Sequence, residues 1–297
     1  MTISRGRVIS ARGQRVFQAI ALGLGIGLAL ASIRAGILWT DGQVYWMAAE
    51  RLRAGESLYP AAGDPEVAFY KYAPWFAWVW VPLTYLPEPM VAGGWTIAML
   101  AAWAMPLRAA MGAGWRGRTV VFLAAPPLLV AALGGNVQPA VIAALWAWLD
   151  RRWGPAAVGC AASLQVFPIL FTVIYAARRQ WWRAGVAVAL GALLWLPALA
   201  YGIEDYPEVI GGVFSLWRIS PAAYVVVVVL LAGWTWSAQR WSAASLLVLA
   251  ATGARFIPYH LGYLLCSFPR PALEDGQATA SPIPGAASGS STPANTG

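Results

Sequence analysis

The sequence predicts an all-α polytopic membrane protein, a bundle of about nine transmembrane helices. Two observations on composition support this fold class: 60% of the 297 residues are hydrophobic and 11% are charged, with a mean hydropathy of +0.61. A soluble domain is roughly half apolar and about a quarter charged. The third observation is that the apolar runs are continuous rather than alternating, which excludes an outer-membrane β-barrel. No long polar block is present that could form a large soluble domain.

Nine apolar runs are the predicted spans, and from the fourth to the seventh each contains proline: Pro126 and Pro127, then Pro139, Pro168 and Pro197. Membrane helices tolerate proline when neighbouring helices satisfy the freed carbonyl groups. The spans are 16–39, 73–87, 90–107, 119–134, 138–149, 156–177, 184–202, 222–237 and 241–258. Residues 1–268 are therefore expected to form one transmembrane domain. Residues 269–297 are rich in Pro, Ser, Ala, Thr and Gly, without apolar periodicity, and are expected to be a disordered tail.

The orientation follows from arginines that precede the first span without an acidic residue among them: Arg5, Arg7, Arg12 and Arg15. The positive-inside rule then predicts a plasma-membrane protein with a cytoplasmic N-terminus. Counting nine spans from there places residues 40–72, 203–220 and the segment around His260 outside. The same count also places outside a group of arginines that the rule would put inside: Arg108, Arg116, Arg118, Arg151 and Arg152. This conflict indicates that one short middle span is re-entrant or miscounted.

Charge and cysteine usage narrow the classes further. Lys71 is the only lysine among 20 basic residues, and the excess of arginine does not lie on a soluble face, so no nucleic-acid partner is expected. The two cysteines, Cys160 and Cys266, stand in apolar sequence and are interpreted as packing residues. No metal site or cofactor is predicted. A divalent cation stays open, although no residue pattern supports one.

The first loop carries the most information. From Val44 to Leu58 it is amphipathic and combines aromatic with charged residues, which predicts an interfacial helix on the membrane surface. Asp41 stands just before this helix, at the membrane edge. One interpretation of Asp41 is a helix N-cap. The other is a general base whose pKa is raised by partial desolvation. An aspartate can serve both purposes, and both interpretations stay open.

Several blocks in this region occur in a characteristic order: Asp41-Gly42-x-x-Tyr45, Ala48-Ala49-x-x-Leu52-x-x-Gly55-x-x-Leu58-Tyr59-Pro60, Phe69-x-x-Tyr72-x-Pro74 and Pro82-Leu83-x-x-Leu86-Pro87. In this order they resemble the N-terminal signature of glycosyltransferase family 87. The similarity is close over 37–90 and looser over 130–200, where it includes Gly134 to Gln138, Gly159 to Pro168 and Arg178 to Arg183.

The resemblance implies a C-type membrane transferase that uses a polyprenyl-phosphate sugar, with mannose the expected sugar. In that family the acidic residue at the start of the first external loop is the catalytic base, which corresponds to Asp41. The implied reaction is inverting. Asp41 takes the proton of an acceptor hydroxyl on an extracytoplasmic lipid or glycan, and that oxygen attacks C1 of the donor sugar. The lipid phosphate then leaves, and its oxygens require stabilisation by cations.

Two departures from the family pattern concern substrate binding. The family shows Gly-Gln-x-Asn where this chain has Asn136 and Gln138 exchanged, so both amides are retained as predicted substrate-binding residues together with Tyr45. The family commonly has a lysine three residues before the proline of the next span, and this chain has Gln165 there, which is also a predicted substrate-binding residue. The missing cation has three candidate replacements for binding the donor phosphate: Lys71, Arg255 and His260. Arg255 is otherwise interpreted as a snorkelling residue and His260 as a structural hydrogen-bonding residue.

Two other functions stay open. Proline-broken spans with few charges also fit a transporter or flippase of a lipid-linked precursor, although no inverted repeat is evident. Gln165 and the short C-terminal half fit a non-catalytic relative of the transferases. The acidic loop with Glu204, Asp205 and Glu208 is interpreted as a solvated external loop.

Overall fold

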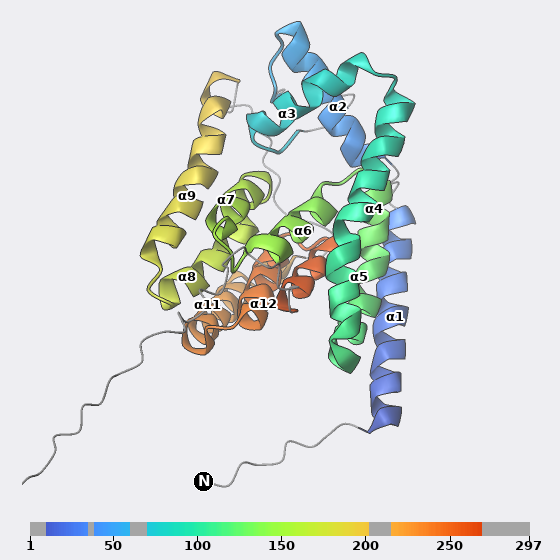
Figure 1. Ribbon diagram of the computed structural model, residues 1–297, viewed down its shortest axis with the longest axis vertical. Helices are drawn as coiled ribbons and strands as arrows, with labels where there is room; N and C mark the ends of the chain where they lie inside the picture. The colour runs from blue at the N-terminus through green and yellow to red at the C-terminus, as the bar shows by residue number, and fades with distance from the viewer. Residues whose placement is uncertain (1–9, 35–38, 60–69, 202–214, 269–297) are drawn as a thin grey trace, which may run out of the picture.

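The structure is a computed structural model, and it describes residues 10–34, 39–59, 70–201 and 215–268. α-Helices and 3₁₀-helices make up most of these residues (Figure 1). Several predictions fall outside the described residues: the disordered tail at 269–297, the external acidic loop, and the basic residues Arg5 and Arg7.

Five helical segments among the described residues are long and apolar enough to cross a membrane. Their lipid-compatible character also appears in large apolar side chains that are left exposed, such as Ile20 at 62% and Leu230 at 66%. The chain therefore has the make-up of a helical membrane protein. The segments belong to α1 (Ala11–Arg34), α4 (Glu88–Gly112), α5 (Gly114–Leu133), α9 (Trp181–Trp195) continued by η3 (Leu196–Ala200), and α11 (Pro221–Ala238).

The remaining predicted spans are helical but shorter, so the count of nine is not confirmed. The predicted span 73–87 is a pair of short helices, and 138–149 is a single short helix. In the predicted span 241–258, the helical structure ends before the predicted last residue. These elements are α3 (Pro74–Trp80) with η1 (Val81–Tyr85), α6 (Gln138–Trp148), and α12 (Trp241–Ala251) with η5 (Thr252–Ala254).

The predicted span 156–177 is divided in the structure. α7 (Gly154–Leu164) ends before Gln165, whose backbone is extended at φ −147°, and η2 (Phe167–Phe171) and α8 (Thr172–Ala177) follow. Pro168 explains the break, because it has no N–H to offer to the carbonyl of Leu164 and its ring would collide with that group.

α1 and α5 pack side by side and run in the same direction (Figure 1). Near their beginnings Gln18 Nε2 donates to the carbonyl of Trp115 at 3.5 Å, and beyond the end of α1 the Trp39 N–H donates to that of Leu133 at 3.2 Å. At their crossing a Cβ on Gly25 would lie 2.6 Å from the carbonyl oxygen of Phe122, so only glycine allows this approach. α4 runs antiparallel to α5 through a turn at Ala113.

The short helices are arranged so that the molecule has two distinct ends. The beginning of α6 and the end of α12 lie near Asp41, whereas the α4–α5, α6–α7, α8–α9 and α11–α12 turns lie at the far end. The segment 74–85 does not cross to the far end: Ala73 is bonded to Ser163, and Thr84 of η1 to Arg53. The arginines that the nine-span count placed on the side of Asp41 lie at the far end instead: Arg108, Arg116, Arg118, Arg151 and Arg152.

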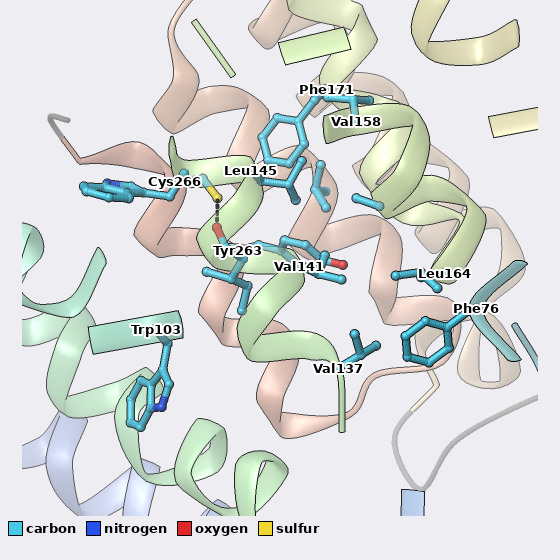
Figure 2. Packing of buried hydrophobic residues seen from close by; sticks show 14 of the residues in the cluster. Phe76, Trp103, Val137, Val141, Leu145, Val158, Leu164, Phe171, Tyr263 and Cys266 are labelled. Atoms are coloured by element: carbon cyan, nitrogen blue, oxygen red, sulfur yellow. Dashed lines mark hydrogen bonds between the residues drawn. The ribbon is translucent and has the colours of Figure 1, made fainter. Parts of the chain in front are cut away.

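One part of the core lies between α6, α7 and the last described helix, η6 (Pro258–Ser267), and the core continues to residues of α3 and α4 such as Phe76 and Trp103 (Figure 2). Tyr263 and Cys266 of η6 are fully buried against Val141 and Leu145 of α6. The Cys266 thiol lies 3.9 Å from the carbonyl oxygen of Ile142, which confirms the prediction that this cysteine is a packing residue. η6 therefore fixes its own Tyr259, and the chain that precedes it with Arg255, against the bundle.

Candidate functional site

The site is built on the C-terminal end of α5. The Asn136 N–H donates to the carbonyl of Ala131 at 2.8 Å and the Gly135 N–H to that of Ala132 at 3.1 Å, which is the Schellman pattern of a helix end. Gly135 has φ +75°, a conformation that favours glycine. A Cβ at Gly135 would lie 2.7 Å from the backbone nitrogen of Gly42, so this turn lies directly against the helix that carries Asp41.

That helix, α2 (Thr40–Ala54), begins on the end of α5. The backbone N–H groups of Asp41 and Gly42 both donate to the carbonyl of Gly134, at 3.0 and 3.2 Å. The N-cap residue is Trp39, and it makes no side-chain capping hydrogen bond. Asp41 lies in the first turn, but its carboxylate does not cap the helix. The interpretation of Asp41 as a helix N-cap is therefore not supported. Its carboxylate is not used to cap α2.

The Asp41 carboxylate is partly buried and held at one oxygen only. Asn136 Nδ2 donates to Oδ2 at 2.9 Å. The Asn136 amide is itself oriented, because its Oδ1 accepts the backbone N–H of Gln138 at 2.7 Å. The second oxygen of Asp41 has no hydrogen-bond partner among the described residues. Burial raises the pKa of Asp41, and the hydrogen bond from Asn136 opposes that rise.

Two cations lie close enough to Asp41 for their charges to lower its pKa, Lys71 and Arg255. They also act on each other: burial, and then the charge of Arg255, lower the pKa of Lys71 to about 8. The Nε of Arg255 is buried and has no hydrogen-bond partner within the described part of the chain. Lys71 and Arg255 together carry one positive charge more than Asp41 neutralises. This excess favours the binding of a further anion.

Two tyrosines complete the group, Tyr72 and Tyr259. The charges of Asp41 and Arg255 act on both hydroxyls, and Asn136 lies close enough to Tyr259 to oppose the rise in the pKa of its hydroxyl. The sequence patterns do not single out either tyrosine as a site residue. The signals that could have found them are the block Phe69-x-x-Tyr72-x-Pro74, which contains Tyr72, and the position of Tyr259 before His260.

Tyr45 lies one turn beyond Asp41 on α2, but it is fully buried. Its hydroxyl lies 3.0 Å from that of Tyr72 and accepts the Val137 N–H at 3.3 Å. Its ring packs edge-on against Phe76 with centroids 4.9 Å apart. Tyr45 is a predicted substrate-binding residue, but in the structure it lies behind Tyr72 and supports it.

His260 is 4% exposed, and its Nδ1 accepts the backbone N–H of Ile257 at 3.2 Å. Burial and the charge of Arg255 lower the pKa of His260 to about 3, so the imidazole is neutral at pH 7. A protonated His260 as the ligand of the donor phosphate is therefore not supported. The hydrogen bond to Ile257 fits the structural interpretation.

The other two predicted amides occupy different positions. Gln138 is fully buried at the beginning of α6, where its backbone N–H orients Asn136. Gln165 is half-buried, and its Oε1 accepts the hydroxyl of Tyr263 at 2.8 Å. The residues that the structure brings together are thus Asp41, Lys71, Asn136 and Arg255. Gln165, at the position of the family lysine, is bonded to η6 instead.

Within the described ranges, no group of three or more His, Cys, Asp or Glu side chains is placed to hold a metal ion. No protein-family model matches the chain, and no curated protein or solved structure matches it.

Proposed function

We propose that the chain is a membrane glycosyltransferase that moves a sugar, mannose in the first instance, from a polyprenyl-phosphate donor to an extracytoplasmic lipid or glycan acceptor. The resemblance to glycosyltransferase family 87 suggests this reaction. The observation that carries the proposal is the geometry of Asp41: Asn136 fixes one carboxylate oxygen, and the other, near the charges of Lys71 and Arg255, accepts no hydrogen bond from any residue that the structure describes.

This arrangement suits an inverting displacement. The unengaged oxygen of Asp41 takes the proton of an acceptor hydroxyl while that hydroxyl oxygen forms a bond to C1 of the sugar. The bond between C1 and the phosphate oxygen breaks, and its electron pair leaves with the lipid phosphate. Lys71 and Arg255 stabilise the negative charge that develops on the phosphate. Burial helps the base, because a carboxylate with a raised pKa accepts a proton more readily.

The distribution of arginine supports an outward-facing site. Arginines concentrate at the end of the molecule away from Asp41, where α1 begins and the α4–α5 and α6–α7 turns lie. The positive-inside rule favours a cytoplasmic location for that end, which supports an outer-face location for the Asp41 end. A donor with a long apolar tail also suits a site next to the ends of long apolar helices.

The test is sugar transfer by membranes supplied with radiolabelled polyprenyl-phosphate mannose, comparing the wild type with Asp41→Asn. Asparagine has the same shape and can still accept the hydrogen bond from Asn136, so the fold is expected to persist. The matched control is Glu50→Gln, an exposed carboxylate on the same helix that lies 3.9 Å from Arg53. We expect Asp41→Asn to lose transfer by about 100-fold or more, and Glu50→Gln to retain it.

Other outcomes separate the competing functions. Equal transfer by wild type and Asp41→Asn would remove Asp41 from the chemistry. Translocation of the labelled lipid across the bilayer without sugar transfer, unchanged in Asp41→Asn, would favour a flippase. Binding of the donor without turnover in the wild type would favour a non-catalytic relative.

A further inference from the structure

Three turns at the end of the molecule away from Asp41 are joined into one surface, here called the arginine platform (residues 149–153, 178–180 and 239–240). Arg178 lies 3.5 Å from Asp150 and donates to the carbonyl of Gln239 at 2.8 Å. Gln239 Nε2 in turn donates to the carbonyl of Ala177 at 3.0 Å, and Trp241 donates to Asp150. Arg183 also holds the first of these turns, because its guanidinium donates to the carbonyl of Leu149 at 3.2 Å and to that of Arg151.

The platform carries positive charge that is largely uncompensated. Asp150 is the one acidic residue in these three turns, and it pairs with Arg178. Arg152, Arg179 and Arg240 are exposed and make no ion pair with any residue that the structure describes. Their charges are therefore available to an anion from outside.

Aromatic rings hold one of the three unpaired arginines, Arg152, and two of the arginines that join the turns, Arg178 and Arg183. The guanidinium of Arg152 lies over Trp153 at 5.6 Å from the ring centroid, that of Arg178 over Trp241 at 5.1 Å, and that of Arg183 over Tyr175 at 4.7 Å. A ring orients a guanidinium as a carboxylate would, but it does not cancel the charge. A guanidinium held in this way can offer its N–H groups to two oxygens of a phosphate.

Large tryptophans surround the platform and stay exposed. Trp153 is 58% exposed, Trp181 60% and Trp182 79%. Exposed indoles at helix ends are typical of the headgroup layer of a bilayer, where one part of the ring is apolar and the other is wet. The phosphate that the arginines favour is thus expected in a lipid rather than in free solution.

We infer that the arginine platform is a binding site for the phosphate headgroup of an anionic phospholipid, in the leaflet that faces the beginning of α1. The three uncompensated arginines provide the charge and the tryptophans the contact with the upper acyl chains. This site is separate from the Asp41 cluster and does not depend on the proposed function.

The test uses the whole protein in phosphatidylcholine nanodiscs with increasing phosphatidylglycerol, and follows lipid binding by native mass spectrometry. The platform variant combines Arg152→Gln, Arg179→Gln and Arg240→Gln. The control combines Arg108→Gln, Arg116→Gln and Arg118→Gln, which removes the same charge from exposed residues at the α4–α5 turn. We expect roughly 100-fold weaker binding of phosphatidylglycerol in the platform variant and a much smaller loss in the control.

Equal losses of phosphatidylglycerol binding in the two triple variants would overturn the inference. They would show that positive charge anywhere at this end of the molecule attracts the lipid, without a specific site. Displacement of phosphatidylglycerol by inorganic phosphate would also overturn the inference. Binding of phosphatidylcholine as tight as that of phosphatidylglycerol would overturn it too. If the platform triple fails to fold, the single variants Arg179→Gln and Arg240→Gln leave the Asp150–Arg178 pair intact. Each is then expected to weaken phosphatidylglycerol binding by about fivefold, and unchanged binding in both would count against the site.

Discussion

The two ends of the molecule use positive charge in different ways. At the Asp41 end, Lys71 and Arg255 are partly buried and lie near a carboxylate, so their charges alter the pKa values of the neighbouring groups. At the arginine platform, Arg152, Arg179 and Arg240 are exposed and none lies near an unpaired carboxylate among the described residues. Burial, rather than the number of cations, therefore separates a candidate reaction site from a candidate docking surface.

The largest effect is expected from removing a buried cation. We expect Arg255→Gln to lower kcat/KM for the donor by roughly 100-fold, because the phosphate would lose a charge in a desolvated position. Arg34→Gln, which removes an exposed arginine at the end of α1, is the control and should change little. Steady-state kinetics over a range of donor concentrations would measure both. Equal effects of the two variants would mean that burial does not distinguish the cations.

The next effect concerns the turn that joins α5 to α2. Gly135→Ala and Gly55→Ala both place alanine at positive φ, +75° and +74°, but only at Gly135 does the new Cβ meet another backbone. We expect Gly55→Ala to lower the free energy of unfolding by about 1 kcal/mol, and Gly135→Ala by about 2 kcal/mol more. Thermal unfolding in detergent would compare them. Similar losses would show that the close approach to Gly42 contributes nothing.

A smaller effect is expected at Asn136, whose amide orients Asp41. Asn136→Ala removes the hydrogen bond that lowers the pKa of Asp41, so the acidic limb of the pH–rate profile should move to higher pH. We expect kcat to fall about tenfold while KM for the donor stays unchanged. Gln165→Ala, which removes an amide bonded to Tyr263, is the control. A rise in KM alone would instead indicate that Asn136 binds substrate.

The mildest test is the pH dependence of the wild type. Asp41 must be deprotonated to act as a base, so activity should fall as the pH drops through its raised pKa. Lys71 must be protonated to hold a phosphate, so kcat/KM should fall as the pH rises through about 8. In Lys71→Arg the alkaline limb should disappear, because arginine stays charged. An unchanged alkaline limb in that variant would exclude Lys71 as its origin.

The sequence indicates much of the fold and part of the site. Composition predicts the helical membrane class, because continuous apolar runs need no knowledge of contacts. The number of spans is not predictable in this way, since breaks such as Gln165 before Pro168 depend on local backbone geometry. Asp41 was identified by its place in a motif. The orientation of its carboxylate by Asn136 could not be predicted, because that contact depends on how the end of α5 meets the beginning of α2.

The arginines show the same limit. Counting spans assigns Arg151 and Arg152 to the side of Asp41, because the count lets each apolar run cross the membrane. The segment 74–85 stays at the Asp41 end instead, where Arg53 donates to Thr84 at 3.1 Å. Contacts of this kind join segments that are distant in the sequence, and periodicity alone does not reveal them.

Asp41 is tested most directly as the general base by measuring donor binding and sugar transfer separately in the purified protein. Asp41→Asn should bind a polyprenyl-phosphate sugar with the affinity of the wild type, because Lys71 and Arg255 remain. In a single turnover it should transfer sugar at least about 100-fold more slowly. Transfer at the wild-type rate would contradict the assignment of Asp41 as the base. Loss of donor binding with an intact fold would assign Asp41 to binding instead of chemistry.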